Sequence, residues 1–233
     1  MRPFTYTSAK DKEQAIQSLT ATSHYLGGVT NPLDLMNEDV ERTDQLIEIS
    51  NLDYKAVSAN SKGGLTIGGM LSNSETANHP EVRKNYPLLS MAMLSAASAQ
   101  IRNMATNGGN LLQRTRCPYF FETSMPCNKR DPGSGCGAIK GMNSLHAIFG
   151  YSESCIAVNP SDMCVALAAL GASVEVQTPE GSTRVIEFTD FHRLPGSNPE
   201  KDNTLKSGEL ITAIHLDTPR FSDHYYYLKI RER

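Results

Sequence analysis

The chain has 233 residues, with 22 Lys and Arg against 25 Asp and Glu and a formal net charge of -3. This length is enough for one large domain or two small ones with a substantial core. The near balance of charge argues against a polyanion-binding surface, so nucleic acid is not an expected partner. No N-terminal export signal and no run of roughly 20 apolar residues is visible, so we expect no membrane insertion.

The first quarter of the chain alternates short helical and extended segments. Residues 11–19 have the pattern of a short amphipathic helix. Residues 25–36, with the sequence YLGGVTNPLDLM, predict a strand end, a glycine turn and the start of a second helix. Residues 45–50 predict a strand.

A β-rich run and a long helical region follow. Residues 63–73 combine apolar β-formers with two glycine pairs. Residues 81–105 carry apolar side chains at helical spacing, and Pro87 interrupts the pattern. We expect this helical region to end at residues 106–113, TNGGNLLQ.

The second half begins with an irregular loop that contains most of the cysteines. After it, residues 146–150 and 155–159 look like strands. Residues 160–172 predict a helix that Ser161 or Asp162 can cap and Gly171 can end.

The last part of the chain is predominantly extended. Residues 172–188 predict a hairpin around the turn TPEG, and residues 208–217 predict a further strand. The aromatic run 225–233 looks like a strand that meets no turn or cap, so the sequence looks cut at this end. Together these segments predict an α+β protein with mixed sheets.

The five cysteines are too few for a disulfide-dense scaffold, and their number is odd. Zinc sites usually contain a CxxC pair, which the chain lacks. Disulfides would leave one thiol over, whereas a cubane cluster tolerates wide ligand spacing. Zinc, disulfides, a cluster and plain burial all stay open for Cys117, Cys127, Cys136 and Cys155. Cys164 lies in an apolar helical run and is expected in the core.

Three glycine pairs adjoin apolar segments: Gly27-Gly28, Gly68-Gly69 and Gly108-Gly109. Tight turns with exposed backbone N–H groups bind anions, and several such turns together suggest a ligand with a diphosphate. None of the three matches GxGxxG or the P-loop pattern, so the familiar nucleotide folds are disfavoured.

The order of the motifs carries a resemblance. LGGVTNPLDLM, TIGG, QIRNMATNGGNLLQRTRCPYF, NPSDM, GELITAIHL and YYLKIRER follow one another as in the FAD-binding subunit of the molybdenum-containing hydroxylases, the xanthine dehydrogenase and aldehyde oxidase family. The chain is most similar to the flavin subunit of the bacterial periplasmic aldehyde oxidoreductases, through RNMATNGGNLLQRTRCPYF and PCNKRDPGSGC.

The resemblance implies a vanillyl-alcohol-oxidase (PCMH-type) FAD-binding fold of two α+β subdomains. Its expected parts are residues 1–57, residues 58–222 with an iron-sulfur loop at 113–156, and residues 223–233 as the start of a C-terminal domain that is missing here. Compared with the family's usual AGGTNLLDLM, the first loop holds one extra residue, Val29 or Pro32.

The resemblance also implies the contacts to FAD. Backbone N–H groups of the first loop would hold the pyrophosphate, Asp162 would bond the adenosine or ribityl part, and Ile211 and Lys229 would lie near the isoalloxazine ring. The expected FAD-binding residues are Leu26, Gly27, Gly28, Val29, Thr30, Asn31, Pro32, Leu33, Thr106, Gly109, Asn110, Leu111, Ser161, Asp162, Ile211 and Lys229.

Resemblance further implies a [4Fe-4S] cluster with Cys117, Cys127, Cys136 and Cys155 as ligands. Lys129, Arg130 and Lys140 could offset its charge or simply be solvated loop charges. None of the six histidines forms a metal-binding pattern, and surface or core roles are expected for His146, His192 and His215.

No catalytic residue is expected in this chain, because no Ser-His-Asp, Cys-His or paired-carboxylate arrangement is visible. The resemblance implies an electron-transfer subunit whose FAD receives electrons from a molybdenum-binding large subunit through a [2Fe-2S] small subunit and passes them to an unknown acceptor. The substrates implied are aldehydes. Alternatives are a self-sufficient flavin-dependent alcohol oxidase and a scaffold that has lost FAD. The protein is expected in the periplasm, by co-export with a signal-bearing partner, or in the cytoplasm.

Overall fold

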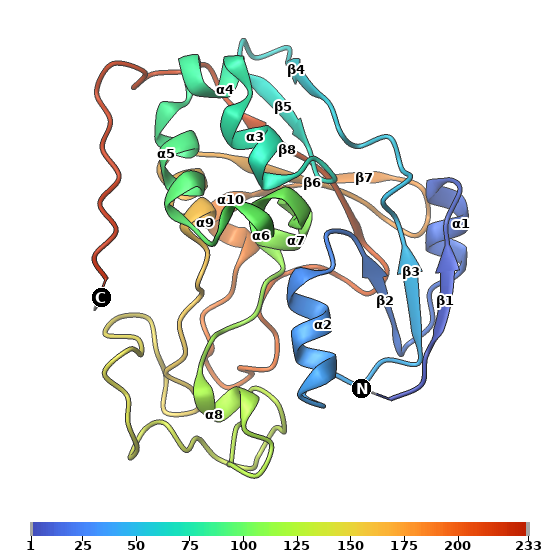
Figure 1. Cartoon of the computed structure of the whole chain (residues 1–233), viewed down its shortest axis with the longest axis vertical. Coiled ribbons are helices and arrows are strands. Elements are labelled where there is room, and N and C mark those ends of the chain that lie inside the picture. Colours follow the sequence, from blue (N-terminus) through green and yellow to red (C-terminus); the bar gives the residue numbers. More distant parts are fainter. Residues whose placement is uncertain (1, 232–233) are drawn as a thin grey trace.

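The computed structural model describes residues 2–231 and contains two sheets (Figure 1). The first sheet has three parallel strands in the order β1-β3-β2. Its strands and helices are β1 (Thr5–Ser8), α1 (Lys12–Gln17), β2 (Ser23–Leu26), α2 (Thr30–Asn37) and β3 (Gln45–Glu48).

Local sequence explains why this sheet is parallel. Parallel neighbours need a crossover connection, and α1 and α2 supply it. The Asp11 side chain accepts a hydrogen bond from the Gln14 backbone N–H at 2.7 Å, which starts α1. All three strands therefore point their carboxyl ends to the same edge, where β2 ends at Leu26 and the glycine turn follows.

The second sheet has five antiparallel strands in the order β4-β5-β8-β6-β7. They are β4 (Val57–Ala59), β5 (Leu65–Gly68), β6 (Ser173–Gln177), β7 (Thr183–Glu187) and β8 (Leu210–Leu216). The central strand β8 is buried at nearly every position. This matches the apolar run that predicted it, and the hairpin predicted at 172–188 is confirmed.

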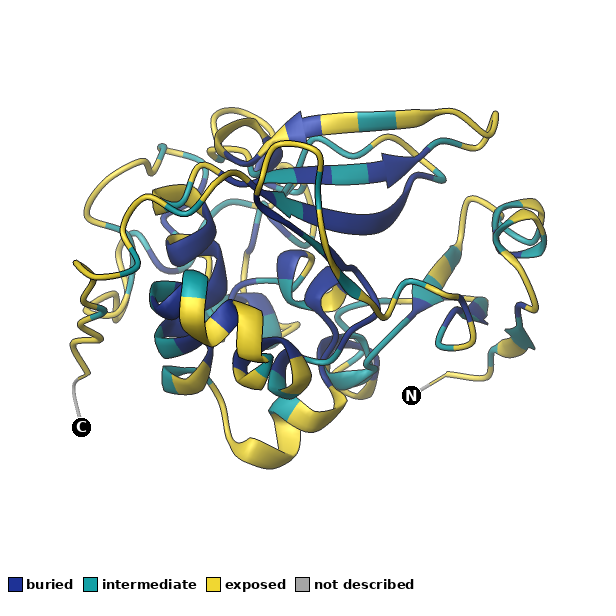
Figure 2. Cartoon of the chain, turned by 90° about the horizontal axis from the view of Figure 1, so that it is seen from above, coloured by how far each residue is buried: buried dark blue, intermediate teal, exposed yellow. Residues whose placement is uncertain are grey.

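Helices cover one face of the antiparallel sheet, and the main core lies between the helices and the sheet (Figure 2). Fully buried Leu89, Met93, Leu167 and Ile214 belong to this core. The helices are α3 (Asn73–Asn78), α4 (Pro80–Asn85), α5 (Pro87–Ser95), α6 (Ala99–Met104), α7 (Asn107–Leu111), α9 (Asp162–Ala169) and α10 (Phe188–Phe191). Among residues 2–231, no helix is long and apolar enough to cross a membrane.

The long helical region predicted at 81–105 is three helices, not two. Pro87 begins α5, as a proline at a first helical position does. A second break separates α5 from α6, where Ala97 takes a positive φ of 46°. The helical region ends within residues 106–113, as predicted, after one further short helix, α7, which Thr106 caps.

Three strand predictions are wrong or only partly testable. Residues 146–150 and 155–159 form no strand: one backbone bond, from Ala147 N to Ile156 O, joins the two segments, and Cys155 forms an isolated bridge with Ser152. The described part of 225–233 is extended but unpaired and runs past α5 (Figure 1), while residues 232 and 233 lie outside the described residues.

The cysteine-rich loop forms a separate lobe at the bottom of Figure 1, with the short helix α8 (Pro118–Phe121) at its start. Phe120, Leu35 of α2 and Cys127 form a small buried cluster that attaches this lobe to the parallel sheet's layer. The α+β prediction is confirmed. The boundaries proposed at residues 57, 113, 156 and 222 stay predictions.

Candidate functional site

A large cavity of about 1190 Å³ lies between the two sheets. Its walls are the loop after β2, the start of α7, the start of α9 and residues 200–211. Ordinary small-ligand pockets occupy about 300–1,000 Å³, so this one has room for an extended ligand of dinucleotide size. The parallel sheet and the antiparallel sheet each contribute one side of it.

The loop after β2 presents unpaired backbone donors to this cavity. Within the described residues, the N–H groups of Gly27, Gly28, Val29, Thr30 and Asn31 make no hydrogen bond to protein. Val29 is the N-cap of α2 with φ 65° and no side-chain cap bond. A positive φ at a β-branched residue costs about 1–3 kcal/mol and is typical of a functional turn. Free donors at a helix N-terminus are the arrangement that binds phosphate.

Gly28 fixes where this loop lies. A Cβ on Gly28 would come within 2.2 Å of Met104 O and 2.6 Å of Thr106 N. Only glycine therefore allows the loop to lie against the backbone between α6 and α7. The contact brings the first glycine pair beside the segment that leads into the third pair, Gly108-Gly109, which the sequence could not show.

Two buried amide side chains of the cavity wall have an atom without a partner. Asn31 accepts a bond from Arg114 N at 2.9 Å through Oδ1, but its Nδ2 donor has no partner in the described chain. Asn73 Oδ1 likewise has no donor. Burying unpaired polar atoms is unfavourable by about 1–3 kcal/mol each. A ligand that offers both acceptors and donors, as FAD does, fits these two positions.

The start of α7 is already bonded within the protein. Gly108 N donates to Gly69 O at 2.7 Å, and Gly109 N donates to Thr106 Oγ1 at 3.2 Å. The amide of Asn107 is fully buried and donates to Gly68 O at 3.0 Å. A Cβ on Gly109 would meet only Thr106 Oγ1, so Gly109 leaves open space in the cavity rather than a free N–H.

The start of α9 forms another wall. Ser161 caps the helix and donates to Asn110 Oδ1 at 2.6 Å. Asp162, which is 6% exposed, accepts bonds from Tyr227 Oη at 2.6 Å and Lys229 Nζ at 2.5 Å. Burial first, and the bond to Asp162 second, raise the pKa of Tyr227. Lys229 is thus held in the cavity wall although it lies near the end of the chain.

The structure brings most of the predicted FAD-binding residues together. Those that line the cavity are Gly27, Gly28, Val29, Thr30, Asn31, Pro32, Thr106, Gly109, Asn110, Ser161, Asp162, Ile211 and Lys229. Leu26, Leu33 and Leu111 do not line it; Leu26 and Leu111 are buried in hydrophobic clusters instead. The individual FAD contacts of all sixteen residues stay predictions.

A second, small cavity lies in the cysteine-rich lobe, and Cys117, Cys127, Cys136 and Cys155 all line it. All four are free thiols. Cys127 and Cys136 lie opposite each other in an isolated antiparallel bridge. Cys164 is buried in the main core with its pKa raised to about 12 by burial, so its predicted core role is confirmed.

The thiols are not arranged tightly. Among residues 2–231, no three His, Cys, Asp or Glu side chains converge on one point closely enough to hold a single metal ion. Burial raises the pKa values of Cys117 and Cys155, and at Cys155 the Ala157 backbone N–H and then the Lys129 charge partly offset the rise. A metal bound through Cys117 or Cys155 would therefore displace a thiol proton that is held more firmly than usual.

His146 is a neighbour of this cavity that the sequence pattern did not reveal. Its Nε2 lies 3.1 Å from Cys117 Sγ, although 29 residues separate them in the chain. The Nδ1 atom is buried without a partner in the described chain. Its ring lies 6.3 Å from that of Tyr119, measured between centroids. No spacing rule would have found this pairing, because the loop between the two residues is irregular.

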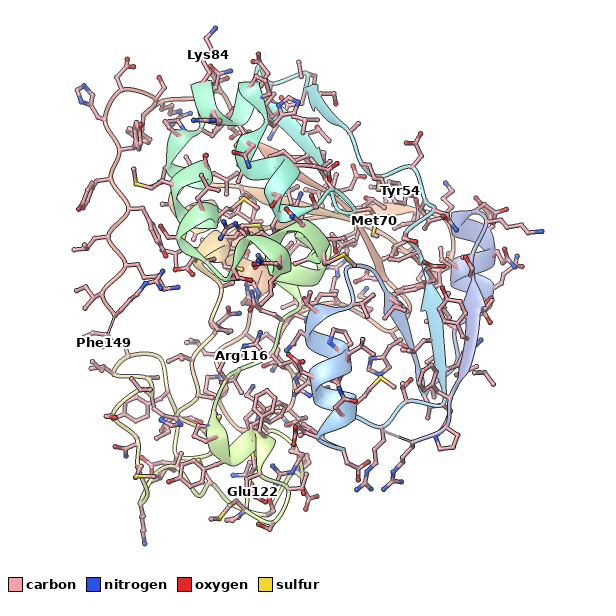
Figure 3. All side chains as sticks on the ribbon, viewed as in Figure 1. Tyr54, Met70, Lys84, Arg116, Glu122 and Phe149 are labelled. Carbon is pink, nitrogen blue, oxygen red and sulfur yellow. The ribbon has the colours of Figure 1, made fainter. Side chains whose placement is uncertain are left out.

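An ion network connects the two cavities. Arg114 lines the large cavity and bonds Asp202 at 2.8 Å and Glu41 at 3.3 Å. Its guanidinium also lies 4.7 Å from the centroid of the Phe120 ring. Lys129, from the cysteine lobe, bonds the other oxygen of Asp202 at 2.5 Å. Arg116 lies at the same junction, where the chain runs from α7 towards α8 (Figure 3).

Comparison with known proteins identifies the class. Residues 2–219 match the family described as the FAD binding domain in molybdopterin dehydrogenase. The chain belongs to this family, so it is the flavoprotein component of an oxidoreductase and has the PCMH-type FAD-binding fold.

Three relatives illustrate the range of similarity. The chain is 46% identical over its whole length to the aldehyde oxidoreductase FAD-binding subunit PaoB of Escherichia coli K12, of which it covers 74%. It is 24% identical over its whole length to the nicotinate dehydrogenase FAD-subunit of Eubacterium barkeri, of which it covers 64%. Its fold matches a chain of the carbon monoxide dehydrogenase of Hydrogenophaga pseudoflava with a TM-score of 0.70 and 17% identity, covering 100% of this chain and 65% of that one.

Proposed function

We propose that the protein is the FAD-binding electron-transfer subunit of a molybdenum-dependent aldehyde oxidoreductase. The observation that carries this proposal is the 1190 Å³ cavity, whose wall holds five consecutive residues with free backbone N–H groups and two amide side chains, Asn31 and Asn73, with an unpartnered atom. The aldehyde assignment rests on the 46% identity to the E. coli aldehyde oxidoreductase subunit. FAD, when bound, supplies the reversible uptake and release of one or two electrons.

The chain's own residues bind and orient this cofactor. The N–H groups of residues 27–31 would donate to the pyrophosphate, and Asn31 Nδ2 would gain the acceptor that it lacks. The missing Cβ of Gly109 leaves room beside Thr106. Lys229, which is paired with the Asp162 carboxylate, would offer N–H donors to a ring bound in the cavity that Ile211 also lines. Donors aimed at developing charge stabilise it.

Substrate oxidation would take place in partner subunits. We propose a large subunit that binds the molybdenum cofactor and a small [2Fe-2S] subunit that delivers electrons to this chain. The similarity to other flavin subunits of this family disfavours a self-sufficient alcohol oxidase. Export to the periplasm with a signal-bearing partner is part of the same proposal.

The test is stopped-flow absorbance of the FAD with an aromatic aldehyde. The isolated chain should be reduced by dithionite and reoxidised by ferricyanide, but aldehyde should bleach it only after the molybdenum and [2Fe-2S] subunits are added. Bleaching of the isolated chain at a catalytic rate would contradict the proposal and favour the self-sufficient oxidase.

We also propose that Cys117, Cys127, Cys136 and Cys155 hold a [4Fe-4S] cluster. All four thiols line one cavity and none forms a disulfide in the structure. A single zinc ion needs four ligands within about 2.3 Å of one point, whereas each thiolate of a cubane binds a different iron. The loose convergence of the thiols is therefore compatible with a cluster. The cluster, when bound, supplies one-electron transfer.

Iron and sulfide analysis of anaerobically purified protein tests the cluster. We expect serine at any of the four positions to lower the iron content. Cys164→Ser is the matched control, because that thiol lies in the main core, and it should leave the iron content unchanged. Stoichiometric zinc, or a disulfide map that pairs the four thiols, would overturn this assignment.

A further inference from the structure

We infer that His146 is a positioning residue for the cysteine site: its ring donates a hydrogen bond to Cys117 Sγ and thereby raises the reduction potential of the cluster. This inference rests on the proposed [4Fe-4S] site. It starts from the 3.1 Å contact between His146 Nε2 and Cys117 Sγ, which lies within hydrogen-bond range for sulfur.

The chemistry of the site defines the direction of this bond. A cysteine that ligates iron is a thiolate and has no proton to donate. A bond between Nε2 and Sγ in the loaded protein must therefore run from the ring N–H to the sulfur. Nε2 then carries the proton that this bond requires. Nδ1 has no partner in the described part of the chain, so no nearby group holds the ring in the opposite tautomer.

The surrounding loop holds the imidazole in place. Tyr119, next to α8's proline, packs near the imidazole at 6.3 Å between ring centroids. The Tyr119 hydroxyl accepts a bond from Met142 N at 2.7 Å, which ties the segment before His146 to α8. His146 N also bonds Asn143 O at 3.0 Å. The ring is therefore positioned by packing and backbone contacts rather than by the cluster alone.

A donor to a thiolate ligand acts on the redox equilibrium. The reduced cluster carries one more negative charge than the oxidised cluster, so a hydrogen bond to its sulfur stabilises the reduced form more. Hydrogen bonds to charged groups contribute enough to change an equilibrium constant by about tenfold. We expect removal of the bond to lower the ratio of reduced to oxidised cluster at a fixed solution potential by about tenfold. This corresponds to a midpoint potential that is lower by about 59 mV for a one-electron couple.

The experiment measures the midpoint potential by EPR-monitored redox titration, together with iron content, in the full chain. His146→Leu removes the donor, while His146→Gln keeps an N–H at the position of Nε2. We expect full iron in both variants, a lower potential in His146→Leu and a potential close to that of the unmodified protein in His146→Gln. His224→Leu is the matched control, because it makes the same change at an exposed position of the C-terminal segment.

The outcomes separate this inference from the proposal on which it rests. If the unmodified protein holds no [4Fe-4S] cluster, the cluster proposal fails and the role of His146 fails with it. If the cluster is present and His146→Leu does not change its potential, only the inference on His146 is wrong. Loss of iron in His146→Leu with intact folding would make His146 a ligand instead, which also overturns the inference.

Discussion

Gly28 and Gly109 lack a side chain for different reasons, although both belong to glycine pairs and both line the large cavity. Gly28 leaves room for protein backbone, since its Cβ would collide with Met104 O. Gly109 leaves room in the cavity, since its Cβ would approach only Thr106 Oγ1 at 3.1 Å. Sequence alone gives the two glycines the same role.

Replacing each glycine with valine should distinguish the structural role of Gly28 from the ligand-binding role of Gly109. Gly109→Val should weaken FAD binding at least tenfold while the melting temperature changes by less than about 4 °C, because valine is no worse than glycine in a helix. Gly28→Val should lower the melting temperature in the absence of FAD as well. Equilibrium dialysis and calorimetry of the two variants check this. Retention of stoichiometric, tightly bound FAD by Gly109→Val would contradict it.

The burial of His192 leads us to expect that the stability of the fold depends on pH. Burial lowers the pKa of His192 below its usual value near 6.5, and its Nε2–H bonds Leu111 O at 2.9 Å. A lowered folded-state pKa means that the unfolded chain binds the proton first. The contribution of His192 is thus complete above about pH 6.5 and is lost as the pH falls towards the folded-state pKa.

Melting temperatures between pH 7.5 and 5 measure this effect. The decline with falling pH should be smaller in His192→Gln than in the unmodified protein, because glutamine keeps a donor but does not titrate in this range. The same substitution at exposed His224 should not alter the decline. Equal declines in His192→Gln and the unmodified protein would argue against the role of His192.

At the scale of elements, the junction between the cysteine lobe and the rest depends on few side chains. Arg114 is 18% exposed and contacts Glu41, Asp202 and Phe120, which come from three separate parts of the chain. Only a planar guanidinium can make these bonds and stack on a ring at once. Arg116, two residues away, is 51% exposed and, within residues 2–231, has a single ion pair, with Asp34 at 3.8 Å.

Lysine at each arginine tests this difference. Arg114→Lys should destabilise the attachment of the cysteine lobe by about 1.5–3 kcal/mol, because it loses charged hydrogen bonds. Hydrogen exchange and limited proteolysis of residues 118–156 should both accelerate. Arg116→Lys should change neither, because an exposed ion pair contributes about 0–1 kcal/mol. Equal behaviour of the two variants would mean that the Arg114 side chain does not hold the lobe in place.

Sequence patterns predicted the helices and strands that have a clear hydrophobic periodicity or a recognisable cap. The helix at residues 160–172, the hairpin at 172–188 and the strand at 208–217 all formed; the helix and β8 are largely buried, and the hairpin buries β6 more than β7. Short elements escaped prediction: β1, β4, α3, α8 and α10 have six residues or fewer. Their structure depends on tertiary partners, such as the pairing of β1 with β3.

The site was predictable in part for the same reason. Loop motifs follow one another along the chain and are read directly, which placed residues 27–31 and 161–162 in the cavity. Side chains from distant segments were not readable: the contacts of Tyr227 with Asp162, of His146 with Cys117 and of Lys129 with Asp202 join residues 29 to 73 positions apart. Only the folded chain brings these groups together.

At the scale of the whole molecule, the large cavity lies between two separate sheets. A ligand that bridges them binds the folded chain and not the unfolded one, so it must raise stability. FAD at about 100 times its dissociation constant should stabilise the protein by about 2.7 kcal/mol, which corresponds to a rise of roughly 5–11 °C in melting temperature. Thermal melts of the apoprotein across an FAD titration check this.

Riboflavin is a useful comparison ligand, because it has the ring without the diphosphate. If the N–H groups of residues 27–31 bind phosphate, riboflavin should raise the melting temperature much less than FAD at equal concentration. An equal rise in melting temperature with both ligands would mean that the ring supplies the binding free energy and that the glycine loop does not bind phosphate.

The close approach of Gly28 to Thr106 also bears on how fast a cofactor binds. The first glycine loop rests on backbone between α6 and α7, so the walls on either side are held at a set separation before any ligand arrives. A preorganised site does not have to order its loops during binding, and the associated entropy loss is avoided. FAD uptake by the apoprotein should then be a single second-order process, with an observed rate that increases linearly with FAD concentration and no slow rearrangement after the encounter.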